Sequence, residues 1–342
     1  MKCFSAVWLA CGLLFFADRA PGVLIDGQNY VSFAGWAAGN GLKTAWVVPG
    51  SEVTASAGST RVSLTVNTHD ARINGVHVVL SYPIANDHGN VLVAEFDLDK
   101  TVRPLLYPSR YLEARKITTI CLDPGHGGKD SGNRVGGFFG HSEKTYTLLL
   151  ALELRDQLRR AGFNVLLTRS RDTYVDLPER PAMANRAGAD LFISLHFNAS
   201  QVEKNEVAGP ETYCITPVGA ASSNSQGEGA DYGPTPANRF SDPSLLLAWE
   251  IQKSLVQNLH VEDRGVRRAR FAVLRDAEMP AILIEGGYMT NPAESKRIYD
   301  ASWRRQMAAA LVKGIQSYQR LVSPSPAGRS VERHSPESMR SN

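Results

Sequence analysis

Two histidines lie where predicted strands end, and the ends of parallel strands are where open α/β sheets place their sites. A single histidine at such a place is usually a loop or packing residue, so it is the two together that indicate a site. Residues 117–128, ITTICLDPGHGG, predict a strand that stops at a sharp turn and presents His126. Residues 190–198, DLFISLHFN, predict a second apolar strand whose end carries His196. Because open α/β sheets place their sites at the carboxyl ends of parallel strands, we expect both side chains at one edge of the sheet.

Two glutamates complete the set of residues that could do hydrolytic chemistry. Glu285 closes a third apolar strand, AILIEGG at residues 281–287, where a carboxylate needs a partner or a solvated cleft. Glu143 opens a predicted helix, where its charge alone would favour the helix N-terminus. Hydrolytic zinc sites use three ligands drawn from histidine and carboxylate, and they leave a fourth position for water. The candidate ligands are His126, Glu143 and His196.

Strands and helices alternate across residues 116–320. This alternation predicts an α/β domain with a mainly parallel sheet flanked by helices. Helical spacing of Ala151, Leu154 and Leu158 predicts the buried face of the first helix, with Ser142 as its N-cap. The predicted helices cover 143–160, 176–186, 244–260 and 294–321, and the further strands cover 164–168, 212–216 and 271–274.

Residues 22–110 predict a small β-rich domain that precedes the α/β domain. Short strand-like runs, among them NYVSFAGWA, RVSLTVNT and NVLVAEFDL, are separated by turn sequences such as Asn74-Gly75. The segments YVSFAGWAAGNG, ARINGVHVVLS and NVLVAEFDL resemble the N-terminal domain of copper amine oxidases, which bacterial envelope proteins reuse. The resemblance does not imply copper or oxidase chemistry, and we favour a structural or targeting module.

Composition and the two ends of the chain indicate an exported protein. The 342 residues are 43% hydrophobic and carry a net charge of +3, so nothing points to nucleic acid as a partner. A short apolar run after Lys2 predicts a signal peptide at 1–20 and no membrane span in the mature chain; a lipoprotein signal at Cys11 is the rival interpretation. We expect the periplasm, the cell envelope or the extracellular space as location, and a disordered tail at 322–342.

Two cysteines, Cys121 and Cys214, remain in the mature chain. Both fall in strand-like sequence, which favours buried thiols that behave as small hydrophobic residues. An oxidising compartment would also permit a disulfide, which the sequence alone does not decide.

Five ordered blocks together resemble the zinc-dependent N-acetylmuramoyl-L-alanine amidases over roughly residues 116–320. The blocks are DPGHGGKDSG, EKTYTLLLALEL, LTRSRDTYVDLPERPAMAN, DLFISLHFNAS and RGVRRARFAVLRDAEMPAILIEGGYMTN. The resemblance implies that His126, Glu143 and His196 bind one Zn²⁺ and that Glu285 is the catalytic carboxylate. It also implies peptidoglycan as substrate, cut between N-acetylmuramic acid and L-alanine of the stem peptide, and leaves an activator protein open as a partner.

Several further residues carry weaker predictions. Asn198 and Arg267 are candidates for binding substrate, and Arg264 is a second arginine that could meet a peptide carboxylate. His141 lies two residues before Glu143 and could compete as a ligand. The long segment 217–243, rich in Gly, Ser and Pro, is either disordered or a regulatory element near the site.

Two other functions fit the same residues. A zinc peptidase that cuts within the stem peptide would use the same constellation, because metal chemistry does not define the acyl group. A cell-wall-binding protein with a degenerate amidase fold belongs to a different class. The complete set of four residues argues against the second alternative.

Overall fold

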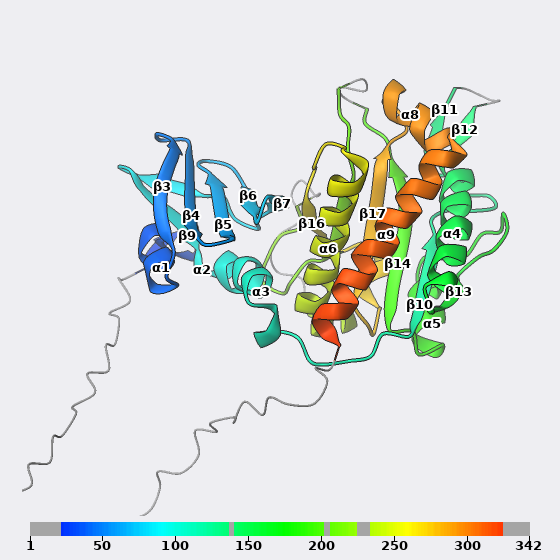
Figure 1. The fold of residues 1–342 in the computed structure, drawn as a ribbon, viewed down its shortest axis with the longest axis horizontal. Coiled ribbons are helices and arrows are strands. Elements are labelled where there is room, and N and C mark those ends of the chain that lie inside the picture. Colours follow the sequence, from blue (N-terminus) through cyan, green and yellow to red (C-terminus); the bar gives the residue numbers. More distant parts are fainter. Residues whose placement is uncertain (1–21, 137–139, 202–205, 224–232, 324–342) are drawn as a thin grey trace, which may run out of the picture. The chain divides into compact units, whose positions relative to one another are not determined.

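The computed structural model describes residues 22–136, 140–201, 206–223 and 233–323, which form two compact units (Figure 1). One unit contains the chain up to Gly75 together with Leu80–Val102, and the other contains Val76–Val79 and the chain from Arg103 onward. The predicted signal peptide at 1–20 lies outside the described residues, as does nearly all of the predicted tail at 322–342.

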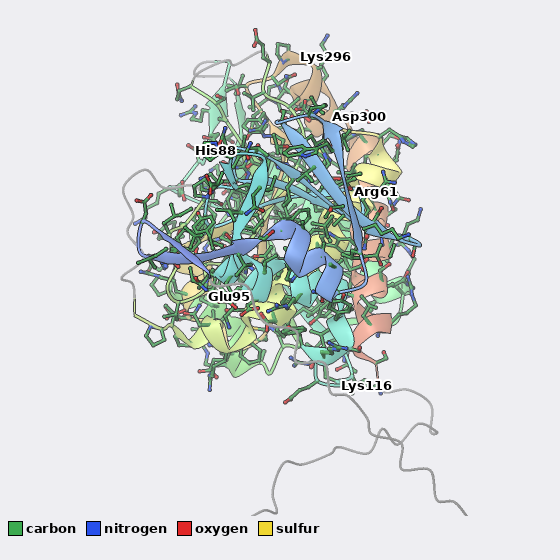
Figure 2. The ribbon with its side chains drawn as sticks, turned by 90° about the vertical axis from the view of Figure 1, so that its left-hand side faces the viewer. Arg61, His88, Glu95, Lys116, Lys296 and Asp300 are labelled. Atoms are coloured by element: carbon green, nitrogen blue, oxygen red, sulfur yellow. The ribbon has the colours of Figure 1, made fainter. Side chains whose placement is uncertain are left out.

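The first unit is β-rich and holds two antiparallel arrays, β1-β2-β9-β8 and β6-β5-β4-β3. The predicted strand NYVSFAGWA is half wrong, because Ser32 caps a helix there by accepting a hydrogen bond from the Gly35 N–H. His88 projects from the turn between β8 and β9 (Figure 2). The elements are β1 (Val23–Ile25), β2 (Gln28–Ser32), α1 (Phe33–Gly39), β3 (Lys43–Val48), β4 (Glu52–Ala57), β5 (Thr60–Thr65), β6 (Asp70–Ile73), β8 (Ala85–Asp87), β9 (Asn90–Ala94), α2 (Glu95–Asp97) and a π-helical turn (Leu98–Val102).

The second unit is built on a mixed sheet in the order β13-β10-β14-β17-β15-β16-β7. Every neighbouring pair in this order is parallel except β15 with β17. The predicted α/β sheet is therefore present, with β15, β16 and β7 running opposite to the other four strands. The strands are β7 (Val76–Val79), β10 (Thr119–Pro124), β13 (Asn164–Leu167), β14 (Leu191–Asn198), β15 (Glu211–Ile215), β16 (Val266–Ala269) and β17 (Ala281–Tyr288); β11 (Arg134–Val135) and β12 (His141–Ser142) form a separate short pair.

Helices cover both faces of this sheet. Three long helices, α4 (Glu143–Arg160), α6 (Ser241–Leu259) and α9 (Ala301–Val322), lie together over one face (Figure 1). The short α5 (Glu179–Arg186) and α7 (Ala272–Arg275) pack with Phe192, Tyr213 and Leu283 in a separate buried cluster. The remaining elements are α3 (Arg103–Leu106), α8 (Pro292–Tyr299) and two 3₁₀ turns, Pro108–Arg110 and Pro236–Phe240.

The helices of this unit agree with the prediction for α4 but differ from it at two places near the end of the chain. The buried face of α4 is confirmed, although Ser142 makes no side-chain capping bond. The predicted single helix over 294–321 is wrong, because the Asp300 side chain accepts from the Trp303 N–H and starts a new helix there (Figure 2). The predicted strand over 271–274 is also wrong, since these residues form the helical turn α7.

Cys121 and Cys214 are free and buried, which confirms the prediction of buried thiols. Burial raises the pKa of Cys121 to about 12, and it also raises the pKa of Cys214. Such thiols stay protonated and unreactive. Among the described residues, no helix is both long and apolar enough to span a bilayer.

Candidate functional site

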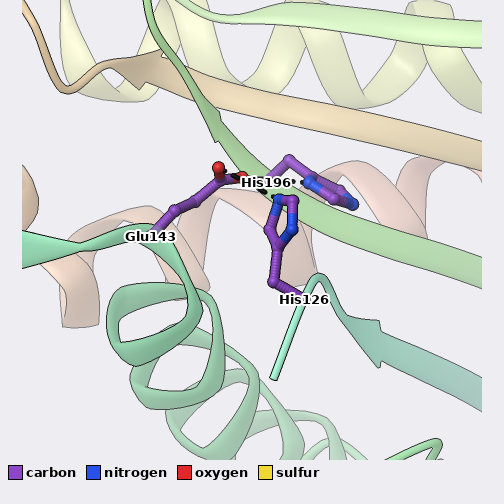
Figure 3. A group of neighbouring side chains, drawn as sticks. All are labelled: His126, Glu143 and His196. Atoms are coloured by element: carbon purple, nitrogen blue, oxygen red, sulfur yellow. Dashed lines mark hydrogen bonds and ion pairs between the residues drawn. The ribbon is translucent and has the colours of Figure 1, made fainter. Parts of the chain in front are cut away.

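His126, Glu143 and His196 come together at one edge of the sheet (Figure 3). His126 follows β10, His196 lies in the neighbouring parallel strand β14, and Glu143 is the first residue of α4. One ligand atom from each residue lies within 4.8 Å of the others. Two imidazoles and one carboxylate are the donor set of a catalytic zinc site, so these residues fit that metal.

Hydrogen bonds fix both oxygens of Glu143, which is 1% exposed. Its Oε2 lies 3.0 Å from His126 Nε2 and accepts from the Asn133 N–H at 2.9 Å. Its Oε1 lies 3.0 Å from His196 Nδ1 and accepts from the Phe197 N–H at 3.1 Å. Burial acts to raise the pKa of Glu143, but the bonds to the two histidines outweigh it and hold the pKa well below its usual range.

Asp130 orients the first histidine. Its Oδ2 lies 2.8 Å from His126 Nδ1, which leaves Nε2 turned toward Glu143. Burial acts to lower the pKa of His126, but Glu143 and Asp130 raise it overall. A carboxylate behind a ligating imidazole is the usual support of a metal site, because it fixes the tautomer and the ring orientation.

Two glycines leave the room that these side chains occupy. A Cβ on Gly125 would lie 2.3 Å from His196 Cε1. A Cβ on Gly132, which has φ +62°, would lie 2.6 Å from both Glu143 Oε2 and His126 Cδ2. The glycines of the DPGHGG and DSG segments therefore form part of the site, because any side chain there would push the candidate ligands apart.

Glu285 faces the same cavity from the adjacent strand. It is paired in register with His196 and lines a 330 Å³ cavity together with the three candidate ligands. Its Oε2 is buried and has no hydrogen-bond partner in the described part of the chain. Burial, followed by the charges of Glu143 and Glu211, raises the pKa of Glu285 well above its usual value. The predicted strand end at Glu285 is wrong, since β17 continues to Tyr288.

The sequence analysis missed Glu211, which lies opposite Glu285 on the antiparallel strand β15. It is 2% exposed and accepts hydrogen bonds from the hydroxyls of Tyr213 and Tyr288. Arg264 and Arg267 surround it, with Nε atoms 3.5 Å and 2.5 Å from its carboxylate oxygens. A glutamate opening the strand ETYCI, followed later by RGVRRAR, was the signal available in the sequence.

The weaker candidates lie away from the three ligands. Asn198 donates to Glu211 at 3.2 Å, so Asn198 and Arg267 share that partner. His141 stacks on Tyr299 with ring centroids 3.7 Å apart, outside the group of candidate ligands. Within the segment 217–243, residues 224–232 lie outside the described chain. The described 3₁₀ turn is held near the end of β15, because Asn238 Nδ2 donates to the carbonyl of Thr216, the residue after that strand.

Comparisons with known proteins agree on one family. The family model described as N-acetylmuramoyl-L-alanine amidase matches residues 120–317. The amidase AmiC of Neisseria meningitidis is 34% identical over 245 residues, which cover 66% of this chain and 57% of that protein. The amidase LytC of Bacillus subtilis is 35% identical over 202 residues, 59% of this chain and 36% of LytC. This chain therefore spans about half the length of such relatives or less.

Solved structures were also found. The N-acetylmuramoyl-L-alanine amidase AmiC2 of Nostoc punctiforme superposes with a TM-score of 0.49 at 32% identity, covering 59% of this chain and 97% of that chain.

Proposed function

Because this chain belongs to the N-acetylmuramoyl-L-alanine amidase family, we propose that it hydrolyses peptidoglycan. The bond cut is the amide that joins the lactyl group of N-acetylmuramic acid to L-alanine of the stem peptide. The observation that carries this proposal is the convergence of His126, Glu143 and His196 with Glu285 in one cavity, inside the residues that match the family.

His126, Glu143 and His196 hold one Zn²⁺ in this proposal. The support is chemical: two imidazoles and a carboxylate match catalytic zinc ligation, Asp130 orients one ring, and two glycines make room for the side chains. A bound Zn²⁺ supplies a Lewis acid and lowers the pKa of water to about 7.

Glu285 moves the proton in the proposed reaction. Its carboxylate takes a proton from the attacking water as the water oxygen bonds to the amide carbon. When the carbon–nitrogen bond breaks, Glu285 gives that proton to the departing amine. The products are a lactyl carboxylate on the sugar and a peptide with a free L-alanine amine. The raised pKa of Glu285 suits a group that must both accept and release a proton.

The cavity walls provide contacts for the substrate. Leu177, Phe271 and Leu283 line its apolar part, which suits the methyl groups of the lactyl and alanyl residues on either side of the amide. Asn198 and Arg267 each direct one N–H group at Glu211. In this proposal, their remaining N–H groups bind the substrate.

We further propose that the protein is exported to the periplasm, the envelope or the extracellular space, where peptidoglycan is its partner. The segment 1–20 is the proposed signal peptide. The β-rich first unit is a structural or targeting module of the copper amine oxidase N-terminal type. An activator protein is a further proposed partner.

The deciding experiment is mass spectrometry of the products released from purified sacculi by the zinc-loaded protein. Peptide-free glycan and intact stem peptides with a free L-alanine amine are expected. Shortened peptides that remain attached to glycan would instead identify a peptidase. Binding to sacculi without any product would favour a wall-binding protein.

A further inference from the structure

Arg169 is a buried arginine that lies beneath the loop carrying His126. It follows β13 and is 3% exposed. A Cβ on Gly127 would lie 2.9 Å from Arg169 Cδ and Nε, so the loop passes directly over this side chain. Among the described residues its guanidinium donates to carbonyl and hydroxyl oxygens only, which is an unusual environment for a buried cation.

The acceptors of Arg169 belong to two different segments. On the side of His126, Nε donates to the carbonyl of Pro124, the last residue of β10, at 2.9 Å, and Nη2 donates to the Gly125 carbonyl at 2.7 Å. On α4, Nη2 also lies 2.9 Å from the Lys144 carbonyl and 3.1 Å from Thr147 Oγ1. Gly125 directly precedes His126, and Lys144 directly follows Glu143. One guanidinium therefore joins the loop that carries His126 to the helix α4 that carries Glu143.

Thr147 completes the connection. Its hydroxyl, buried in the first turns of α4, donates to the Gly125 carbonyl at 2.8 Å. Arg180 lies nearby but acts differently, because it forms an ion pair with Asp123 and donates to the carbonyls of Pro124 and His126, all on the loop side. Of these two arginines, Arg169 is therefore the one whose hydrogen bonds reach both the His126 loop and α4.

We propose that Arg169 is a positioning residue that sets the separation of His126 and Glu143 and so tunes metal affinity. The inference rests on the proposed metal site. The planar guanidinium presents donors in fixed directions, whereas a lysine ammonium is a single point that cannot reach both segments in the same way. Partners behind the ligands of a metal site typically change metal affinity by about 10–100-fold when removed.

The test is zinc affinity of the full chain, measured by competition with a chromogenic chelator, for the unmodified protein, Arg169→Met and Arg169→Lys. We expect the methionine variant to bind about 10–100-fold more weakly and the lysine variant to be intermediate. The visible spectrum of the Co²⁺-loaded protein should change in both variants, because it reports ligand geometry rather than activity. Thr147→Val removes the second link and should weaken binding less than Arg169→Met does.

Arg304→Met is the matched control. Arg304 is also buried, at 8% exposed, and also donates to a backbone carbonyl, that of Ile298. Its guanidinium lies over the Tyr146 ring of α4, 5.7 Å from the centroid, but among the described residues it makes no hydrogen bond to the His126 loop or to α4. We expect it to lower the unfolding midpoint without changing zinc affinity. Equal losses of affinity in both methionine variants, or wild-type affinity in Arg169→Met and Arg169→Lys, would overturn the inference.

The outcomes also separate this inference from the proposed function. Unmodified protein that binds no zinc would overturn the metal site and the role of Arg169 together. If Arg169→Met does not fold, wild-type affinity in both Arg169→Lys and Thr147→Val overturns the inference. Zinc binding with no amidase products would contradict the proposed activity. The role of Arg169 would then be decided by the zinc affinities of the variants alone.

Discussion

Replacing Gly125 by alanine tests whether the metal site depends on the room left for His196. The new Cβ would lie 2.3 Å from His196 Cε1 and 2.5 Å from Nε2, where ordinary contacts begin near 3.4 Å. The backbone is held by the bond from the Gly125 N–H to the Leu195 carbonyl at 2.9 Å, so the ring must move by about 1 Å. Gly125 has no positive φ, and the backbone itself therefore accepts alanine.

A shift of this size is several times the tolerance of about 0.2 Å on metal–ligand distances. We expect zinc affinity to fall by at least about 10–100-fold, as for other disturbances around metal ligands. Release of stem peptides should fall by about 100-fold even at saturating zinc, since a misplacement of about 1 Å has that effect on rates. Chelator competition measures the first quantity, and mass spectrometry of timed digests of sacculi measures the second.

Two controls separate this effect from general damage. Gly39→Ala, in α1, meets no atom within 4 Å and should change nothing. Gly314→Ala forces a Cβ to 2.9 Å from Ile251 Cδ1 between two helices, so it should destabilise the fold without weakening zinc binding. Wild-type affinity and rate in Gly125→Ala would refute the reasoning.

Three other predictions concern single carboxylates of the second unit. Glu285→Gln should keep zinc affinity and lower turnover about 10²–10⁴-fold, because an amide cannot take the proton from water; lost zinc binding would instead make Glu285 a ligand. Arg180→Met leaves Asp123, 2.8 Å away, without its buried charge partner and should lower the free energy of unfolding by about 3–5 kcal/mol in urea titrations; unchanged stability would contradict this. Burial acts to raise the pKa of Asp190, but hydrogen bonds from residues 118 and 119 lower it overall. The stability that this carboxylate contributes is present above about pH 3.9 and is lost as the pH falls through the folded pKa. Asp190→Asn should therefore flatten the decline in unfolding free energy between about pH 5 and pH 3. An unchanged slope would contradict this prediction.

The places of the two candidate histidines could be predicted because each follows from a local pattern with a fixed place in an α/β sheet, whereas the charge of Glu143 alone is explained by its helix N-terminus. His126 and His196 end apolar strand sequences, and such strands lie side by side in parallel sheets. Short helices could not be predicted in the same way. The helical turn α7 has four residues, too few to show a period of 3.6, and its buried Val273 and Leu274 look the same in a strand.

Helix boundaries set by capping hydrogen bonds could not be predicted from hydrophobic periodicity either. The apolar spacing of 294–321 continues across Asp300, but the bond that Asp300 accepts from the Trp303 N–H ends one helix and starts another. Ser32, the last residue of β2, accepts a hydrogen bond from the Gly35 N–H in the same way and starts α1. An Asp or Ser inside an apolar pattern can be a surface residue or a cap, and only the backbone around it decides which.

Glu211 shows why part of the site could not be found from strand ends at all. Parallel strands bring their carboxyl ends to one edge, so a search for polar residues at those ends finds His126 and His196. The strand β15 runs antiparallel to β17, and it therefore brings its amino end to that edge and places Glu211 opposite Glu285. The strand sequence ETYCI does not itself reveal this direction. A carboxylate that raises the pKa of Glu285 therefore enters the site through topology, and residues that open antiparallel strands must be included when such sites are sought.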